Sequence, residues 1–485
     1  MLWNSLREYL DKLAEVGELK KVLGANWEDD IGGITELLTE SQGPALLFDE
    51  IKGYPKGYRV ASNLFNTPKR TAIAFGLPPD LSPQALAERS AATMRDFRPV
   101  APETVTSGPV LENVLKGNDI DLYKFPTPKW HENDGGRYIG TGVCVIQMDP
   151  DTGFVNSGAY RVSVHDRQTC AIFIEHGKHG DVIRRKYWDR GKKCPVIVSV
   201  GQEPVLTALS GSRVHYAAQG VSEFEVAGFI HQSPYPVVKG EFTDLPIPAG
   251  SEIAIEGFIP SPKDVLVPEG PFGEWTGYYA HGRRPETVIE VKAIYHRNAP
   301  IIFGAPPTRP VRGEYFASLG GDNMRAIERL KKAGIPGVTR VFGLSKPHLN
   351  VVAIKQMHSE HVSDVIQALV PGGEQYNGNQ TWIVVDDDID ISNSDEVLWA
   401  IASRCVPEHG VQVIPGTAVW QLDPRVRPND RSDPDKEQGR KRYTAHNLVI
   451  NACRPYDWIK EFPPVCVNSP EFRAEIKKKW KDLFD

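Results

Sequence analysis

The most suggestive chemistry in this sequence lies in a short segment with two carboxylates, Pro268-Glu269-Gly270-Pro271-Phe272-Gly273-Glu274-Trp275. Its glycines and prolines exclude a helix, so we expect a tight turn or a bulge. Such a turn can direct Glu269 and Glu274 into one cavity, where their repulsion raises one pKa and creates a proton donor near neutral pH. Phe272 and Trp275 would strengthen this effect by excluding water. The alternative is two unrelated glutamates on an exposed loop.

A candidate anion-binding arginine, Arg161, ends a segment of mostly small residues, Asn156-Ser157-Gly158-Ala159-Tyr160-Arg161. The segment enters a predicted strand, and a turn around 166–168 leads to a second strand over 171–174, which indicates a hairpin. Ala159 and Ser163 share a strand face with Arg161 and leave room for a bidentate carboxylate or phosphate. From this segment alone, an arginine on an exposed sheet face is slightly favoured.

Two further segments contain donors for a metal ion. Glu175-His176-Gly177-Lys178-His179-Gly180 follows the hairpin, and its histidines and lysine could bind a metal or a phosphate. In Ser222-Glu223-Phe224-Glu225, one carboxylate could complete a ligand set with Asn156 and His179. Oxygen and nitrogen ligands of this kind suit Mn²⁺ or Mg²⁺ better than Zn²⁺. For each segment alone, solvated histidines and an exposed acidic turn are the simpler interpretations.

The composition indicates a globular protein of about three domains, since the chain has 485 residues, of which 40% are hydrophobic and 24% charged. A net charge of -6 argues against a nucleic-acid partner.

Leu2, Leu6, Leu10 and Leu13 alternate with charged residues, which predicts an amphipathic surface helix rather than a signal peptide. We see no apolar run of membrane-spanning length. The six cysteines form no C-x-x-C pair, so reduced thiols and a cytoplasmic location are expected.

The elements that must position these residues fall into three predicted domains. Residues 1–105 form an α/β domain that begins with the amphipathic helix and includes a strand over 45–48 and a helix over 83–94. Residues 106–315 contain short β-branched runs with turn residues between them, typical of a mostly antiparallel β domain or barrel, with a helix over 204–219. Residues 316–485 return to an α/β texture. No P-loop and no Rossmann glycine fingerprint is present.

In order and spacing, these segments resemble the UbiD family of reversible decarboxylases over at least residues 110–410. The Glu-Gly-Pro-Phe-Gly-Glu segment and the Asn-x(4)-Arg segment are together specific for that family. The matching segments are Asn156…Tyr160-Arg161, His179, Gly220-Val221-Ser222-Glu223, Val237-Val238-Lys239, Glu269 to Glu274, and Val385-Asp386-Asp387-Asp388-Ile389-Asp390.

The resemblance implies a role for each matching residue. Asn156, His179 and Glu223 would bind a divalent metal, Mn²⁺ or Mg²⁺, that bridges to the phosphate of prenylated FMN, with His176 as the alternative histidine. Arg161 would orient the substrate carboxylate, Glu269 would tune Arg161, and Glu274 would donate a proton to the carbon that loses carbon dioxide. The residues implied to line the cofactor are Asn156, Ser157, Gly158, Ala159, Tyr160, Arg161, Lys178, His179 and Glu223.

The family's fold and chemistry agree with these residue types. Decarboxylation leaves a carbanion that needs an electron sink, which the modified flavin supplies, and a buried neutral carboxyl group is a suitable proton donor. The resemblance implies a flavin-reductase-like split β-barrel, flanked by an N-terminal α/β domain and by a hinge-linked C-terminal α/β domain that forms a homodimer or higher homo-oligomer. K⁺ is implied as a further ion, and a flavin prenyltransferase as the supplier of the cofactor. One departure concerns the phosphate contact: similar proteins often carry a lysine where this chain reads Asn379-Gln380-Thr381.

The substrate is expected to be a small carboxylic acid that releases CO₂. Polar groups in Tyr278 to Arg284 and in Pro306 to Arg312 favour a hydroxybenzoate-like or heteroaromatic acid over a cinnamic-type acid, unless these arginines lie on the surface. Two other classes remain open. The first is an FMN-binding oxidoreductase on the same barrel, and the second is a non-catalytic cofactor-binding subunit of a larger carboxylase.

Overall fold

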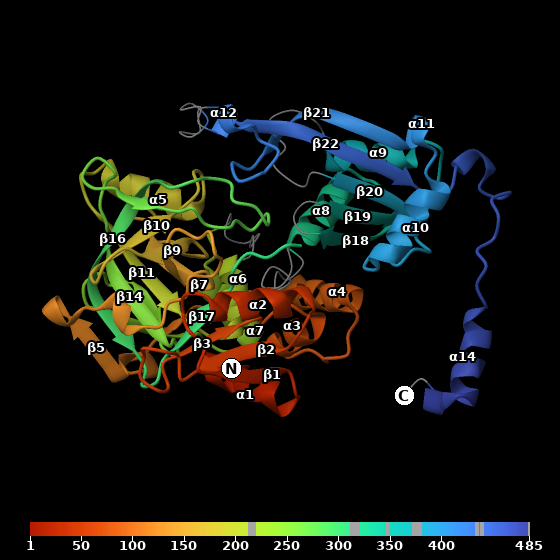
Figure 1. Ribbon diagram of the computed structural model, residues 1–485. Coiled ribbons are helices and arrows are strands. Elements are labelled where there is room, and N and C mark those ends of the chain that lie inside the picture. Colours follow the sequence, from red (N-terminus) through yellow and green to blue (C-terminus); the bar gives the residue numbers. More distant parts are fainter. Residues whose placement is uncertain are drawn as a thin grey trace.

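A computed structural model of the chain describes residues 1–211, 220–310, 321–345, 349–370, 381–431, 436 and 441–483. Figure 1 shows a central sheet region, an N-terminal region packed beside it, and a C-terminal α/β region at the other side of the molecule. This architecture confirms the expected mixed fold, with a curled central sheet and two α/β regions.

The N-terminal region is built on a four-stranded sheet in the order β1-β2-β3-β17. Its strands are β1 (Leu19–Leu23), β2 (Ala45–Asp49), β3 (Arg59–Ser62) and β17 (Ile301–Gly304), and the last of these pairs parallel to β3 although it follows the central sheet in the chain. The helices are α1 (Leu6–Glu15), α2 (Asp30–Glu40), α3 (Pro68–Ala74) and α4 (Pro83–Thr93). Leu6, Leu10 and Leu13 of α1 are buried, which confirms the predicted amphipathic helix.

The central region contains a ten-stranded antiparallel sheet. Its main path runs β6-β9-β10-β16-β14-β11-β7-β8, and β5 and β15 each pair with β16. The strands are β5 (Asn113–Lys116), β6 (Arg137–Gly140), β7 (Val143–Met148), β8 (Val155–Gly158), β9 (Arg161–Val164), β10 (Thr169–Phe173), β11 (Cys194–Val200), β14 (Ile253–Ile259), β15 (Val267–Glu269) and β16 (Arg284–His296). The helices of this region are α5 (His179–Trp188), α6 (Pro204–Gly211) and α7 (Glu223–His231), and a small sheet joins β4 (Glu103–Thr104), β12 (Pro236–Lys239) and β13 (Pro246–Pro248).

The curl of this sheet follows from its connectivity. β8 is the last strand of the path and β9 the second, yet only Ala159 and Tyr160 separate them in the chain. Two residues span a short distance, so the two ends of the sheet must approach each other. The segment between Asn156 and Arg161 therefore crosses the split of the curled sheet.

The C-terminal region is a five-stranded sheet in the order β18-β19-β20-β22-β21, with separate apolar clusters on its two faces. Its strands are β18 (Val338–Ser345), β19 (Leu349–Ile354), β20 (Thr381–Asp386), β21 (Val411–Val419) and β22 (Tyr443–Ala452). Its helices are α8 (Gly321–Lys332), α9 (His361–Leu369), α10 (Ser394–Arg404), α11 (Pro407–Gly410), α12 (Pro428–Arg431) and α14 (Pro470–Lys479). In Figure 1, α14 stands apart at the end of an extended segment, and none of its residues is buried.

The core explains which regions hold together. One apolar cluster combines α1 residues such as Leu6 with central residues such as Ile146 and Ile197, so the N-terminal and central regions share a core. At the Asp-rich end of β20, the buried Arg404 pairs with the buried Asp386 at 3.0 Å and with the exposed Asp388 at 2.8 Å. Within the described ranges, every helix is too short or too polar to cross a bilayer.

Candidate active site

The two carboxylates of the predicted turn lie at the end of β15, where Glu269 is the last strand residue and Glu274 follows a non-helical turn. Gly270 adopts a φ of +87°, a conformation that glycine adopts without steric cost. The loop beneath the turn approaches so closely that a Cβ at Gly135 would lie 1.9 Å from the Gly270 carbonyl oxygen. The amide of Gly135 also donates to the Pro271 carbonyl at 2.7 Å, so this loop fixes the turn.

Arg161, the first residue of β9, lies between these two glutamates. Its Nη1 donates to Glu274 Oε1 at 2.6 Å, and its Nη2 donates to Glu269 Oε2 at 3.0 Å. The side chains of all three residues are nearly buried, with exposed fractions of 9% for Arg161, 2% for Glu269 and 7% for Glu274. The structure thus brings together the arginine and the two glutamates that the sequence analysis selected, although they come from distant parts of the chain.

Two aromatic rings and a tyrosine complete the surroundings of this Glu-Arg-Glu network. The Arg161 guanidinium lies 4.6 Å from the Phe173 ring centroid and 5.2 Å from that of Phe272. The hydroxyl of Tyr138, on β6, donates to Glu269 Oε1 at 2.9 Å. Neither Phe173 nor Tyr138 was predicted from the sequence to be a site residue. The hairpin register, in which Phe173 pairs with Arg161, could have identified the phenylalanine, whereas no sequence signal places β6 beside β9.

Burial controls the protonation of the network. The pKa of Glu274 is raised, mainly because burial disfavours its charge and also because Glu269 repels it, although Arg161 acts in the opposite direction. Burial disfavours the charge of Arg161 too, but Glu274 and Glu269 raise its pKa, so the guanidinium stays cationic. Among the described residues, none donates to the second oxygen of Glu274. A proton on this carboxyl group would therefore be available to a bound molecule.

The residues expected to bind the metal lie at the starts of two helices and on β8. Glu223 is the first residue of α7 and accepts a hydrogen bond from the Ser157 amide at 2.8 Å, next to Asn156. The Tyr160 hydroxyl accepts from Asn156 Nδ2 at 3.4 Å and from the amide of Gly180, beside His179, at 3.0 Å. These contacts link Asn156, Glu223 and the first turn of α5, so the expected ligands belong to one neighbourhood.

This donor set fits a divalent cation. Glu223 is buried, and burial raises its pKa to about 7 because only backbone amides offset its charge. A cation would supply the missing charge compensation. Partial desolvation and the neighbouring Lys178 lower the pKa of His179, which leaves the imidazole neutral, as metal binding requires. Because the amide nitrogen of Asn156 is occupied by Tyr160, its oxygen is the atom that would face the ion.

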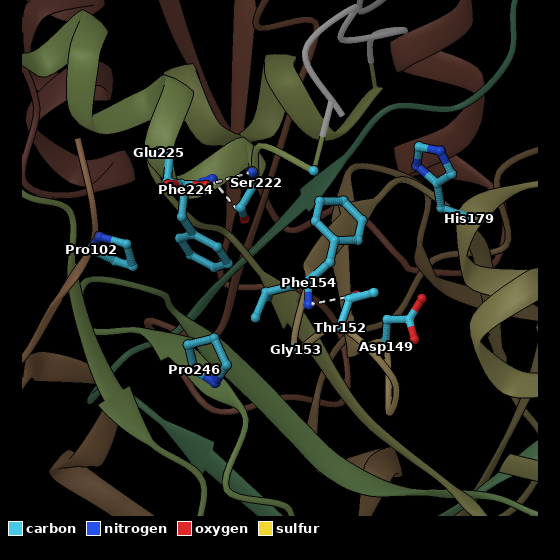
Figure 2. Close-up of a pocket in the computed structure, with 12 residues that line it drawn as sticks. Pro102, Asp149, Thr152, Gly153, Phe154, His179, Ser222, Phe224, Glu225 and Pro246 are labelled. Carbon is cyan, nitrogen blue, oxygen red and sulfur yellow. Dashed lines mark hydrogen bonds between the residues drawn. The ribbon is translucent and has the colours of Figure 1, made fainter. Parts of the chain in front are cut away.

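A cavity of about 550 Å³ lies beside this neighbourhood. Figure 2 shows His179 on one side of the cavity, Ser222, Phe224 and Glu225 on the other, and Phe154 between them. The Phe154 and His179 rings pack edge to face with centroids 5.8 Å apart. His179 therefore lines a space that can hold a ligand.

The structure places other expected residues differently. His176, the alternative ligand, lies 3.0 Å from Asp181 Oδ2, and Lys178 lies 4.3 Å from the ring centroid of Trp420 in the C-terminal region. The Ser157 hydroxyl bonds to Ser210 at 2.7 Å, whereas Ala159 is exposed at the split of the sheet. Asn379 and Gln380 lie outside the described residues.

Two segments that were interpreted as loops begin helices, although His179 itself is exposed, as expected for a solvated histidine. His179 begins α5 and Glu223 begins α7, and both Asn156 and Glu223 are buried. The Ser222 hydroxyl and the Glu225 carboxylate form a capping box at the start of α7. The spacing of Ser222 and Glu225 is a sequence signal that could have predicted this helix.

The comparisons with known proteins cover all three regions. Models of the 3-octaprenyl-4-hydroxybenzoate carboxy-lyase match its N-terminal domain to residues 10–90, its Rift-related domain to 103–310 and its C-terminal domain to 323–452. A phenolic acid decarboxylase from Streptomyces sp. (strain D7) is 31% identical, with 88% of this chain and 90% of the relative covered. A pyrrole-2-carboxylic acid decarboxylase from Pseudomonas aeruginosa is 29% identical, with 98% and 97% covered.

A solved structure with a similar fold comes from Pelotomaculum thermopropionicum. This UbiD-class enzyme in complex with FMN has a TM-score of 0.82 and 27% identity, with 97% of this chain and 99% of that chain covered. An evolved dimeric form of the same enzyme, in complex with prenylated FMN, has a TM-score of 0.78 and 26% identity, with 97% and 98% covered.

Proposed function

Because the chain belongs to the UbiD family of carboxy-lyases, we propose that it reversibly decarboxylates an aromatic or heteroaromatic carboxylic acid with the aid of prenylated FMN. The observation that carries this proposal is the buried pairing of Arg161 with both Glu269 and Glu274. Relatives named for phenolic and pyrrole carboxylic acids support a ring substrate.

The chain's own residues have distinct tasks in this proposal. Arg161 orients the substrate carboxylate, since its Nε is buried and has no hydrogen-bond partner among the described residues. Glu269, held by Tyr138 and Arg161, fixes the guanidinium in place. Glu274 holds a proton at its carboxyl group and transfers it to the carbon that loses carbon dioxide.

When bound, prenylated FMN supplies an electron sink for the charge that develops on that carbon. One side of the cofactor would be lined by the buried segment Asn156 to Gly158 and by the exposed residue Ala159. Arg161 would lie at the edge of the cofactor. Asn156, His179 and Glu223 would hold Mn²⁺ or Mg²⁺ beside the phosphate, where the metal offsets negative charge. A homodimer is proposed as the assembly, which the dimeric neighbour supports.

The first experiment tests the cofactor and the reaction. The protein is purified from cells that also produce a flavin prenyltransferase, and its absorbance, cofactor mass and content of Mn, Mg and K are measured. A panel of hydroxybenzoic, heteroaromatic and cinnamic acids is then tested for CO₂ release. Unmodified FMN with hydride-transfer activity would instead favour an oxidoreductase. CO₂ release from cinnamic acids alone would exclude a substrate whose carboxylate is attached directly to an aromatic or heteroaromatic ring.

The second experiment tests the roles of two glutamates. Glu274→Gln is expected to abolish CO₂ release while cofactor content is unchanged, because the amide cannot donate the acid proton. Glu223→Gln is expected to lower the bound metal per chain. Glu290→Gln, the same change at a surface ion pair with Lys193, serves as the control for both variants. Turnover by Glu274→Gln at the wild-type rate would remove its role as proton donor.

A further inference from the structure

The loop that connects Glu274 to β16 contains a buried imidazole nitrogen with no partner. His281 Nε2 is inaccessible to solvent, and no described residue forms a hydrogen bond with it. A buried polar atom without a partner is costly, so such an atom points to a ligand that the fold expects. The position is close to the Glu-Arg-Glu network, because His281 lies between Glu274 and Arg284 in the chain, and the guanidinium groups of Arg284 and Arg161 contact the same ring.

Two further arginines share this location. Arg284, the first residue of β16, lies opposite Glu269 in the pairing of β15 with β16. Its guanidinium is 4.7 Å from the centroid of the Phe173 ring, the same ring that Arg161 contacts at 4.6 Å. The two guanidinium groups are therefore neighbours around one aromatic side chain.

The second arginine comes from the C-terminal region. Arg431, at the end of α12, donates through Nη1 to the carbonyl of Ala280, next to His281, and through Nη2 to the carbonyl of Asp423 at 2.6 Å. Figure 1 shows α12 at the far end of the hairpin β21–β22. Within the part of the chain that the structure describes, no carboxylate pairs with Arg431, so carbonyl dipoles are its partners.

Among the described residues, one carboxylate forms an ion pair with either of the two arginines of this cluster. Arg284 has one acidic partner, Glu286, at 2.8 Å, and burial raises the pKa of Glu286, so this carboxylate compensates weakly. Burial, together with Arg284, Arg431 and Arg161, lowers the pKa of His281 to about 3. The imidazole is therefore neutral at physiological pH and can donate or accept a hydrogen bond in an electropositive environment.

We propose that His281, Arg284 and Arg431 form a second anion site beside the Glu-Arg-Glu network, and that it binds an ionised carboxylate of the substrate other than the one released. The substrate class is then an aromatic dicarboxylate, with one carboxylate at Arg161 and the other at this site. The inference rests on the proposed decarboxylase function and specifies its substrate. Charged groups bind anions strongly where water is excluded, and arginine matches the planar carboxylate.

The experiment compares benzoate with benzene-1,4-dicarboxylate on the purified holoprotein. Titration calorimetry measures binding, and CO₂ release measures turnover. We expect the dicarboxylate to bind at least tenfold more tightly than benzoate, and Arg431→Gln to remove that difference without weakening benzoate. Arg425→Gln is the matched control, because Arg425 pairs with Asp423 at 3.0 Å on the same segment and should keep the preference. His281→Asn, which keeps a hydrogen-bonding side chain, should lower dicarboxylate affinity to a smaller extent.

The two readouts separate this inference from the function on which it rests. Equal affinity for the two acids, or a preference that Arg431→Gln leaves intact, overturns the second anion site even if monoacids are decarboxylated. Absence of CO₂ release from every acid, with the binding preference present and sensitive to Arg431→Gln, supports the anion site and overturns the decarboxylase. A KM for the dicarboxylate that rises in Arg431→Gln while kcat is maintained supports a binding role.

Discussion

Replacement of Tyr138 by phenylalanine removes the hydroxyl that donates to Glu269 of the Glu-Arg-Glu network, together with its longer contact of 3.3 Å to the Pro271 carbonyl. The ring is buried and packs on Phe272 with centroids 4.1 Å apart, so the change removes the hydroxyl without leaving a cavity. Glu269 then keeps Arg161 as its donor and loses the bond of 2.9 Å. A hydrogen bond to a charged group contributes about 1.5–3 kcal/mol. If that energy holds Glu269 and Arg161 in place during the reaction, kcat falls roughly 10- to 150-fold.

The matched control is Tyr295→Phe, because Tyr295 is also buried and its hydroxyl donates to a glutamate, Glu256, at 2.7 Å. Glu256 lies outside the network and keeps donors from Phe242 and Thr243. Both variants lose a tyrosine–glutamate bond, so they should lose comparable thermal stability. Steady-state kinetics with the best acid from the panel, together with cofactor content, then separates catalysis from folding.

Two results would contradict this reasoning. The first is a Tyr138→Phe enzyme whose kcat is within twofold of the wild type at equal cofactor content. The second is an equal loss of kcat in Tyr295→Phe, since this would attribute the effect to general destabilisation.

Since burial raises the pKa of Glu274 and the protonated form is the donor, kcat should fall as pH rises through that raised pKa, and a pH–rate profile without this alkaline limb would contradict the assignment. Arg404→Met removes one of the two cations that pair with the buried carboxylate of Asp386, which keeps Arg454 at 3.0 Å, and should cost about 1–3 kcal/mol in urea unfolding. Burial acts to raise the pKa of Asp388, but Arg404 lowers it overall, so the stability from this pair is present above the ordinary aspartate pKa and is lost as pH falls through the lowered one. Deletion of 464–485 removes the unburied helix α14 and should reduce the oligomeric state measured by light scattering, whereas an unchanged mass would show that α14 makes no contact between copies.

The sequence predicted the catalytic residues of the site better than the neighbouring residues that hold them in place. Arg161, Glu269 and Glu274 belong to recognisable segments, and their convergence followed from the family resemblance. Tyr138 was not predictable, because its place depends on the pairing of β6 with β9, in which the register shifts between Arg137 and Gly140. Long-range strand pairing is set by tertiary packing rather than by local pattern.

The fold was predicted in outline and missed in two local places. Alternation and turn residues indicated the antiparallel central sheet, and the spacing of leucines indicated α1. The helices that begin at His179 and Glu223 were interpreted as loops, since a glycine follows His179 and two glutamates flank Phe224 in their first turns. Tertiary burial overrides that weak local preference, because helical propensity differs by less than about 1 kcal/mol per residue for most residue types.

The late arrival of β17 has a consequence for biosynthesis. The sheet that contains β1, β2 and β3 lacks its fourth strand until Ile301–Gly304 has left the ribosome, and until then the free side of β3 exposes unpaired backbone amides and carbonyls. A nascent chain with an open strand edge is prone to aberrant pairing, so chaperone dependence should be greatest before this segment emerges. A truncated gene that stops before residue 300 should accordingly yield insoluble product, whichever residues of the catalytic network it retains.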